Sequence, residues 1–284
     1  MQDLREMTRA SLDGNAQGPE PRAEDRRPAL HQPVLLAEVL ELFAGCARPR
    51  VVVDGTVGLG GHSAAMLEAR GSEIEILIGV DRDPEALAMA RDRMKAVGAK
   101  TSLLLQQGSY ICIPKLLQDE EIPGADFVLL DLGVSTYQLK TPRRGFSLIA
   151  DGPLDMRMDP GHGSTAAELL ERATATELES WLRHYGEVRQ AGRIARALWE
   201  RRSTLRTTGA LAAAVLDALR LRRPPPGEIH PATQVFQALR IAVNCELDDL
   251  DAVLPDTLQR LAPEGRFAVI SFSARLRAVE SLRS

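Results

Sequence analysis

One stretch of the chain constrains its fold more than any other. Residues 51–54 form an apolar, β-branched run that ends in an acid, and a glycine-rich turn leads from it to a helix expected from about Ser63. About 20 residues further on, a second apolar run, 74–80, also ends in an acid, Asp81. Glycines let the backbone approach a ligand closely, and an acid that ends the second strand can accept ribose hydroxyls. The stretch therefore predicts a nucleoside-cofactor pocket in an open α/β sheet.

Strands and helices alternate through the first half of the chain. Apolar runs predict further strands at 101–106 and 126–132, and a short helix is expected at 34–43. The pair Asp83–Pro84 predicts the start of another helix, because proline fits the first helical turn. Residues 127–130, inside the last of these runs, are apolar throughout, as is typical of a buried parallel strand. This alternation favours a doubly wound sheet.

Residues 140–230 break the alternation. After a loop rich in Gly, Pro and Met, two capping-box patterns, Thr165–Glu168 and Thr174–Glu177, each open a run with apolar residues at helical spacing. Further helices are expected at 190–202 and 209–221. We therefore predict an inserted, all-helical subdomain.

The sheet domain is expected to resume at residue 231. A single long helix is predicted from about Thr233, followed by a turn at 263–265 and a fifth strand over Arg266–Phe272. The expected buried stripe of that helix consists of Phe236, Leu239, Val243, Leu247 and Leu250. The sequence predicts a polar, disordered leader over 1–29, a sheet domain over 30–139 and 231–284, and the helical subdomain over 140–230.

Composition narrows the possible partners and compartments. The net charge is −4 and only 4% of residues are aromatic, so nucleic acid would have to meet a local patch rather than a basic, aromatic face. The three cysteines form no CxxC pair, which favours reduced, buried thiols and no metal site. No apolar run approaches the ~20 residues of a membrane span, and no secretory signal is visible. A cytoplasmic protein is expected, or one of an organelle matrix if the host is a eukaryote.

The glycine spacing bears on which cofactor is bound. Gly58-x-Gly60-Gly61 differs from the GxGxxG of dinucleotide-binding proteins. The pattern D-x-T-x-G-x-G-G resembles the first loop of class I S-adenosylmethionine-dependent methyltransferases. On this loop and Asp81 alone, a nicotinamide-dependent dehydrogenase stays open as an alternative.

Four further segments carry a resemblance to one family. They are HQPVLLAE at 31–38, DLGVS at 131–135 with Gln138–Leu139, RGFS at 144–147 followed by DGPLDMRMD at 151–159, and HPAT at 230–233 followed by FQALRIAVN at 236–244. With the glycine loop they resemble the bacterial 16S ribosomal RNA cytosine-N4 methyltransferases, the MraW (RsmH) family. The resemblance implies a class I, Rossmann-like sheet with a helical insertion. It also implies methylation of a cytosine N4 amine in small-subunit ribosomal RNA, within the small ribosomal subunit.

The resemblance also implies which residues hold S-adenosylmethionine. They are Gly58, Gly60, Gly61, His62, Asp81, Tyr110, Asp131 and Gln138. Structural alternatives stay open for several of them: Asp81 can cap the helix that follows, His62 can touch backbone only, and Tyr110 can belong to the core.

Methyl transfer to a cytosine amine sets demands on the site. The amine lone pair is delocalised into the ring, so a site must hold the nitrogen in line with the methyl group and accept its hydrogens. Asp131 is the best candidate acceptor. Asp155 and Arg157 lie in a loop that can close over the base, although an internal ion-pair network is an equal alternative.

A polar row on the predicted long helix adds another candidate. Gln237, Arg240 and Asn244 share one helix face, which can line the substrate cleft or bond the glycine-rich loops. Asn244 is the member that we assign to the catalytic candidates, with Asp131, Asp155 and Arg157.

An RNA surface is expected in the insertion. Residues 183–223 contain ten Arg and three acids, a net charge of +7. The densest part consists of Arg193, Arg196, Arg201, Arg202 and Arg206. Arginine forks onto phosphate oxygens, although a solvated helix face is the plain alternative. The target base would have to be unpaired or extruded.

The end of the chain departs from the family pattern. The family continues its fifth strand as Ile-Ser-Phe-His-Ser-Leu-Glu-Asp-Arg; here Ile270-Ser271-Phe272 agrees and Ser273 replaces the histidine. The sequence for the last two strands of the family is not found in this chain, so an exposed sheet edge is expected beside the fifth strand. This leaves a second alternative, a non-catalytic ribosome-associated module that keeps the cofactor pocket.

Overall fold

The computed structural model describes residues 33–224, 227 and 229–271. The predicted leader, the first two residues of the HQPVLLAE segment and the chain beyond Ser271 lie outside this part. Among the described residues, no helix combines the length and the apolar character needed to cross a bilayer.

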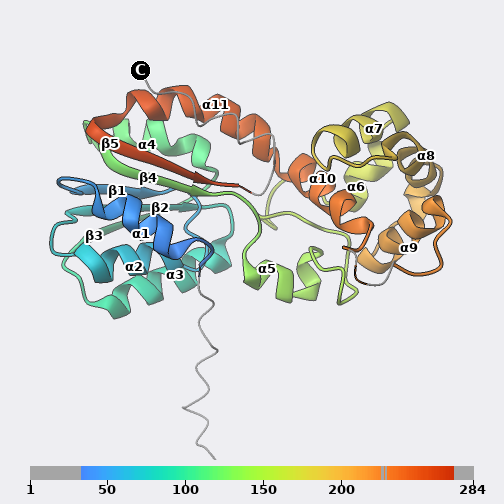
Figure 1. Cartoon of the computed structure of the whole chain (residues 1–284), viewed down its shortest axis with the longest axis horizontal. Helices are drawn as coiled ribbons and strands as arrows, with labels where there is room; N and C mark the ends of the chain where they lie inside the picture. Colours follow the sequence, from blue (N-terminus) through green and yellow to red (C-terminus); the bar gives the residue numbers. More distant parts are fainter. Residues whose placement is uncertain (1–32, 225–226, 228, 272–284) are drawn as a thin grey trace, which may run out of the picture. The chain divides into compact units, whose positions relative to one another are not determined.

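The described fold is built on five parallel strands in the order β3-β2-β1-β4-β5 (Figure 1). The strands are β1 (Val51–Asp54), β2 (Ile76–Asp81), β3 (Ser102–Gln107), β4 (Ala125–Asp131) and β5 (Leu261–Ile270). The chain moves outward from β1 to β3 and then returns to the other side of β1. The topological switch point therefore lies between β1 and β4, where open α/β sheets bind their ligands.

The predicted α/β fold is confirmed, and strands β1 to β4 lie within two residues of their expected bounds. The fifth strand differs, because it begins at Leu261 rather than at Arg266. The expected turn at 263–265 is an irregularity inside the strand: Glu264 has a φ of 63°, and the register with β4 shifts between Ala125 and Phe127.

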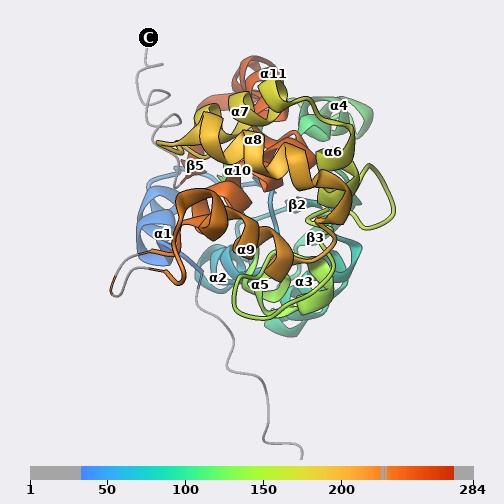
Figure 2. The ribbon, with the colours of Figure 1, turned by 90° about the vertical axis from the view of Figure 1, so that its right-hand side faces the viewer.

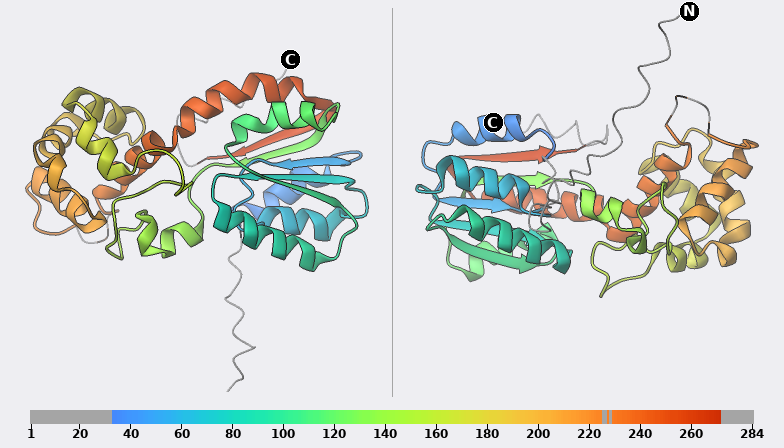
Figure 3. Two further views of the ribbon diagram at one scale, coloured as in Figure 1. Left: turned by 180° about the vertical axis from the view of Figure 1, so that it is seen from behind. Right: turned by 90° about the horizontal axis from the view of Figure 1, so that it is seen from below.

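Helices cover both faces of the sheet (Figure 3). One face packs against α1 (Leu36–Ala44), α2 (Gly61–Arg70) and α3 (Pro84–Val97); the other packs against the short η2 (Tyr110–Cys112), α4 (Ile113–Asp119) and α11 (Glu246–Gln259). Successive strand residues point to opposite faces. Val52 thus joins the α1–α3 core and Val53 joins the α4–α11 core, and both are fully buried.

The remaining helices pack around a core of their own, the helical core, which is separate from the cores on the two faces of the sheet (Figure 2). They are α6 (Ala166–Arg172), α7 (Ala175–His184), α8 (Ala191–Arg201), α9 (Thr208–Leu219) and α10 (Ala232–Asn244), with the short α5 (Thr136–Lys140), η3 (Pro142–Arg144) and η4 (Arg202–Thr204) in the connections. Both capping boxes are present: the Thr165 and Thr174 hydroxyls accept from backbone N–H groups, and Glu168 and Glu177 reach back to the cap N–H groups.

The prediction of one long helix after Thr233 is wrong. Cys245 adopts a left-handed conformation, with φ 50° and ψ 36°, and separates α10 from α11. Phe236 and Leu239 are buried in the helical core, whereas Leu250 is buried in the sheet core. One straight helix cannot pack against both the helical core and the α4–α11 core of the sheet. The change of packing between α10 and α11 therefore falls at Cys245.

The left-handed backbone at Cys245 predicts a stability difference between two variants. In that conformation a Cβ costs about 1–2 kcal/mol, part of which glycine returns through its larger unfolded-state entropy. We expect Cys245→Gly to be more stable than Cys245→Ala by about 0.5–1 kcal/mol in urea unfolding. Both variants lose the exposed thiol, so the comparison isolates the backbone. Equal stability would show that residue 245 carries no strain.

Candidate functional site

Three aspartates end three adjacent strands. Asp54 ends β1, Asp81 ends β2 and Asp131 ends β4. Because the strands are parallel and neighbours in the order β2-β1-β4, the three carboxylates meet at one edge of the sheet, at the switch point. The sequence predicted Asp81 and Asp131 as site residues but assigned no role to Asp54.

The glycine loop runs along this edge and needs glycine at two positions. Gly58 and Gly60 have φ values of 50° and 72°, which lie in the left-handed region. A Cβ on Gly60 would lie 3.0 Å from the Ala90 Cα, so this glycine also lets the loop pack on α3. At Gly58 a Cβ would meet nothing closer than the Thr56 carbonyl oxygen, at 3.8 Å. The Gly58 side of the loop is therefore open to a ligand.

Asp81 ties the loop to the second strand. Its Oδ2 accepts from the Gly58 N–H at 2.7 Å, and its Oδ1 accepts from the Asp83 N–H at 2.9 Å. Burial raises the pKa of Asp81 to about 6. Asp83, not Asp81, caps α3, by accepting from the Glu85 N–H. Each Asp81 oxygen keeps one lone pair that a ribose hydroxyl can use.

His62 lies between the two other acids. The side chain is 6% exposed; its Nε2 is 2.9 Å from the Val34 carbonyl oxygen and its Nδ1 is 4.0 Å from Asp131 Oδ2. Asp54 is 1% exposed and accepts from the Ser63 hydroxyl at 2.6 Å. Burial raises the pKa of both Asp54 and Asp131, and the nearby His62 lowers both. Burial thus disfavours the charged form of both acids, and a cation bound beside them would favour it.

Two residues that the resemblance placed at the cofactor make hydrogen bonds within the protein. Tyr110 is 5% exposed within the sheet core, and its hydroxyl donates to the Glu246 carbonyl oxygen. Gln138 is 4% exposed; its Nε2 donates to Asp83 Oδ2 at 3.0 Å and its Oε1 accepts from the Ser135 N–H at 3.0 Å. These contacts favour the structural alternative for both side chains.

The catalytic candidates outside the sheet edge also bond internally. Arg157 donates to both oxygens of Asp155, at 2.7 and 2.9 Å. Asn244 accepts from the Met158 N–H and donates to the Met156 carbonyl oxygen, each at 2.8 Å, and its second N–H donates to the Arg240 carbonyl oxygen. The alternative of an internal network therefore describes this loop, which Asn244 fastens to α10.

A buried ion pair that was not predicted from the sequence lies beside the site. Arg144 Nη1 lies 2.6 Å from Asp83 Oδ2, and the two side chains are 3% and 0% exposed. Arg144 Nη2 also donates to the Arg157 and Met158 carbonyl oxygens, at 3.1 and 2.8 Å. The partners are 61 positions apart in the chain. The sequence signals were a second acid two residues after Asp81 and the arginine that opens the RGFS segment.

The predicted RNA-binding arginines lie on and around α8, and most already have acidic partners. Three exposed pairs are Arg196–Glu200 at 3.2 Å, Arg201–Asp217 at 2.8 Å and Arg206–Glu171 at 2.9 Å. Arg202 lies over the Trp199 ring, 4.4 Å from its centroid, while Arg193 is exposed and contacts Gln190. Exposed pairs like these contribute little to stability, so the arginines can exchange partners at low cost.

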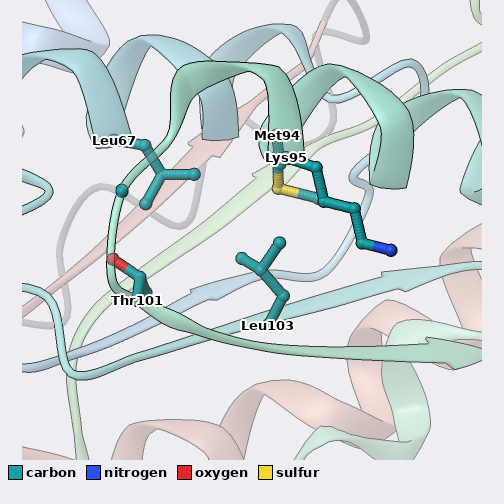
Figure 4. A pocket seen from close by; sticks show the side chains of 6 residues that line it. Leu67, Met94, Lys95, Thr101 and Leu103 are labelled. Carbon is teal, nitrogen blue, oxygen red and sulfur yellow. The ribbon is translucent and has the colours of Figure 1, made fainter.

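A pocket of about 350 Å³ lies elsewhere, at the amino ends of the strands (Figure 4). Leu67, Met94 and Leu103 line it with apolar side chains, and Lys95 extends away from them. It lies at the opposite edge of the sheet from the three aspartates, so we assign it no part in the site. Among the described residues, no group of three or more His, Cys, Asp or Glu is arranged to hold a metal ion.

Comparison with known proteins decides the family. Residues 28–279 match the sequence model of the MraW methylase family. The chain belongs to this family. The ribosomal RNA small subunit methyltransferase H of Syntrophotalea carbinolica is 47% identical to it over 247 residues, covering 85% of this chain and 76% of that protein. The protein of the same name from Methylobacterium sp. (strain 4-46) is 45% identical over 246 residues, covering 86% of this chain and 71% of its own length.

Family membership confirms the resemblance drawn from the sequence and favours neither the dehydrogenase nor the non-catalytic alternative. A solved structure, the rRNA methyltransferase aviRa from Streptomyces viridochromogenes, aligns with 37% of this chain and 61% of its own. Its identity of 18% and TM-score of 0.28 are too low to support an inference.

The buried ion pair predicts a large stability loss at one arginine and a small loss at its neighbour. Arg144→Met would leave the Asp83 charge buried without its partner, which costs about 3–5 kcal/mol. Arg143→Met would break an exposed pair with Glu85 and an exposed hydrogen bond to the Tyr137 hydroxyl, together worth about 0–1 kcal/mol. Urea unfolding of both variants measures the difference. Similar losses at the two positions would contradict the role of the Arg144–Asp83 pair.

Proposed function

We propose that this chain transfers a methyl group from S-adenosylmethionine to the N4 amine of a cytosine in small-subunit ribosomal RNA. The observation that carries the proposal is the site at the switch point, where Asp54, Asp81 and Asp131 surround a glycine loop in a member of a methylase family. The names of the relatives, which are small-subunit ribosomal RNA methyltransferases, support the substrate.

The residues at the sheet edge fit a nucleoside sulfonium donor. Asp81 has free lone pairs for ribose hydroxyls, and the Gly58 side of the loop is open. When bound, the donor supplies a methyl group on a positively charged sulfur. The acids Asp54 and Asp131 complement that charge, since both are partly or wholly withdrawn from water.

Asp131 is the side chain best placed to act on the amine. Its side chain is 28% exposed at the switch point, whereas Asp54 is 1% exposed and already accepts from Ser63. A carboxylate that accepts an amine hydrogen localises the nitrogen lone pair and takes the proton as the nitrogen gains the methyl group. Holding the amine nitrogen in line with the methyl group of the donor contributes at least as much to the rate as this proton acceptance.

The RNA is proposed to meet the arginine-rich surface around α8, with the small ribosomal subunit as the natural substrate. Four of the five arginines are exposed there, and their acidic partners are themselves exposed. Phosphate oxygens can replace those carboxylates with the same forked geometry. Asp155 and Arg157 are proposed to shape the adjoining loop rather than to touch the reacting atoms.

Labelled methyl transfer tests the function directly. Small ribosomal subunits incubated with the chain and methyl-labelled donor are expected to gain label on a cytosine N4. Asp131→Asn should lower the single-turnover rate about 100-fold, and the exposed Asp92→Asn serves as the matched control. If the unaltered chain binds the donor but transfers no label to subunits or bare RNA, the proposal is wrong.

Donor affinity should depend on pH through Asp81. The charged carboxylate binds ribose hydroxyls more strongly than its protonated form, and the pKa of about 6 places the change in an accessible range. We expect affinity to be highest above about pH 7 and to fall as the pH drops through 6. Asp81→Asn should weaken binding about 10-fold and flatten this dependence. Calorimetric titration measures both; an unaltered pH dependence in the variant would remove Asp81 from the donor site.

A further inference from the structure

His62 has one ring nitrogen whose role is settled by its partner. Its Nε2 lies 2.9 Å from the Val34 carbonyl oxygen. A carbonyl oxygen only accepts hydrogen bonds, so Nε2 carries a hydrogen in every protonation state of the ring. Nδ1 is therefore the nitrogen on which a proton comes and goes.

That second nitrogen faces the proposed proton acceptor. Nδ1 is 4.0 Å from Asp131 Oδ2. This separation exceeds a hydrogen bond, but catalytic contacts often shorten only when substrate binds. The imidazole is 6% exposed and has little freedom to turn elsewhere, because its other nitrogen is bonded to backbone. The ring is thus oriented toward the carboxylate before any ligand arrives.

The groups around Asp131 leave His62 as its basic neighbour. Burial raises the pKa of Asp131, His62 on α2 lowers it, and Asp54 on β1 raises it. On the α10 side, Arg240 comes near Gly133 but its guanidinium is paired with Glu246 at 2.7 Å. Among the described residues, His62 is therefore the side chain able to take a proton from Asp131.

We propose that His62 is a positioning residue that receives, at Nδ1, the proton which Asp131 accepts from the substrate amine. The inference rests on the proposed function. As the amine nitrogen gains the methyl group, the carbon–sulfur bond of the donor would break with its electron pair going to sulfur, and the amine N–H bond would break with its pair staying on nitrogen. The proton passes to Asp131 Oδ2 and then to Nδ1, which leaves an imidazolium beside a restored carboxylate. No further reagent is consumed.

A pH profile separates this role from a merely structural one. His62→Gln keeps an amide N–H for the Val34 carbonyl but removes the titrating nitrogen, and His184→Gln changes an exposed histidine as the matched control. The single-turnover rate of His62→Gln should be about tenfold lower in alkaline solution, because only a neutral ring can receive the proton, and should approach the unaltered rate in acid. A rate lowered equally at every pH, or unchanged, would overturn the proposal.

A second measurement does not require methyl transfer. In the full chain labelled with ¹⁵N-histidine, the neutral ring of His62 should carry its hydrogen on Nε2 and leave Nδ1 bare. A neutral ring protonated at Nδ1 would overturn the inference. Failure of the methylation assay alone would instead count against the proposed function.

Discussion

Three carboxylates lie together at the carboxyl ends of β1, β2 and β4, and each needs a hydrogen-bond donor or a positive charge beside it. The arrangement of the rest of the site depends on which groups supply these partners. Desolvation disfavours each charge, so each must be bonded, paired or protonated. Asp81 accepts from two backbone N–H groups, Asp54 accepts from Ser63, and Asp131 faces His62. The glycine loop and the first turn of α2 supply all of these donors except one, the Asp83 N–H. The glycine loop, the start of α2 and the strand ends therefore depend on one another, because each supplies polar partners that the others need.

The buried Arg144–Asp83 pair extends this unit toward the helical core. Asp83 donates its N–H to Asp81 and accepts from Arg144, whose other nitrogen bonds the loop carbonyls of Arg157 and Met158. Asn244 of α10 fastens the same loop through the Met158 N–H. A continuous series of hydrogen bonds thus runs from the proposed donor site to α10. Loss of the Arg144–Asp83 pair would therefore remove hydrogen bonds both beside Asp81 and in the loop that Asn244 holds.

The sequence allowed much of the fold to be predicted, because strands β1 to β4 and the capping boxes depend on local patterns. Apolar runs ending in Asp54 and Asp81 and the Thr165 and Thr174 caps need no tertiary information. The break at Cys245 was missed because the apolar spacing continues through it. The folded structure shows that the helical core and the α4–α11 core are separate, so that one continuous helix cannot pack against both.

The residues at the strand ends of the site could be predicted from the sequence, but the hydrogen bonds and ion pairs around them could not. Asp81 and Asp131 follow from their positions at the ends of apolar strands. Tyr110 and Gln138 match the family pattern, yet their polar atoms are bonded within the protein, which no sequence pattern reveals. The Arg144–Asp83 pair joins residues that are distant in the chain, so only the folded structure brings it to light.

The central claim is that the donor binds at the switch point of the sheet, between the glycine loop and the three aspartates. A crystal structure of the chain with S-adenosylhomocysteine, the demethylated form of the donor, tests it most directly. The account predicts ribose hydroxyls within about 3 Å of the Asp81 carboxylate, and the sulfur on the side of Asp131. Binding in the apolar pocket at the opposite edge, or at the switch point without contact to Asp81, would contradict it.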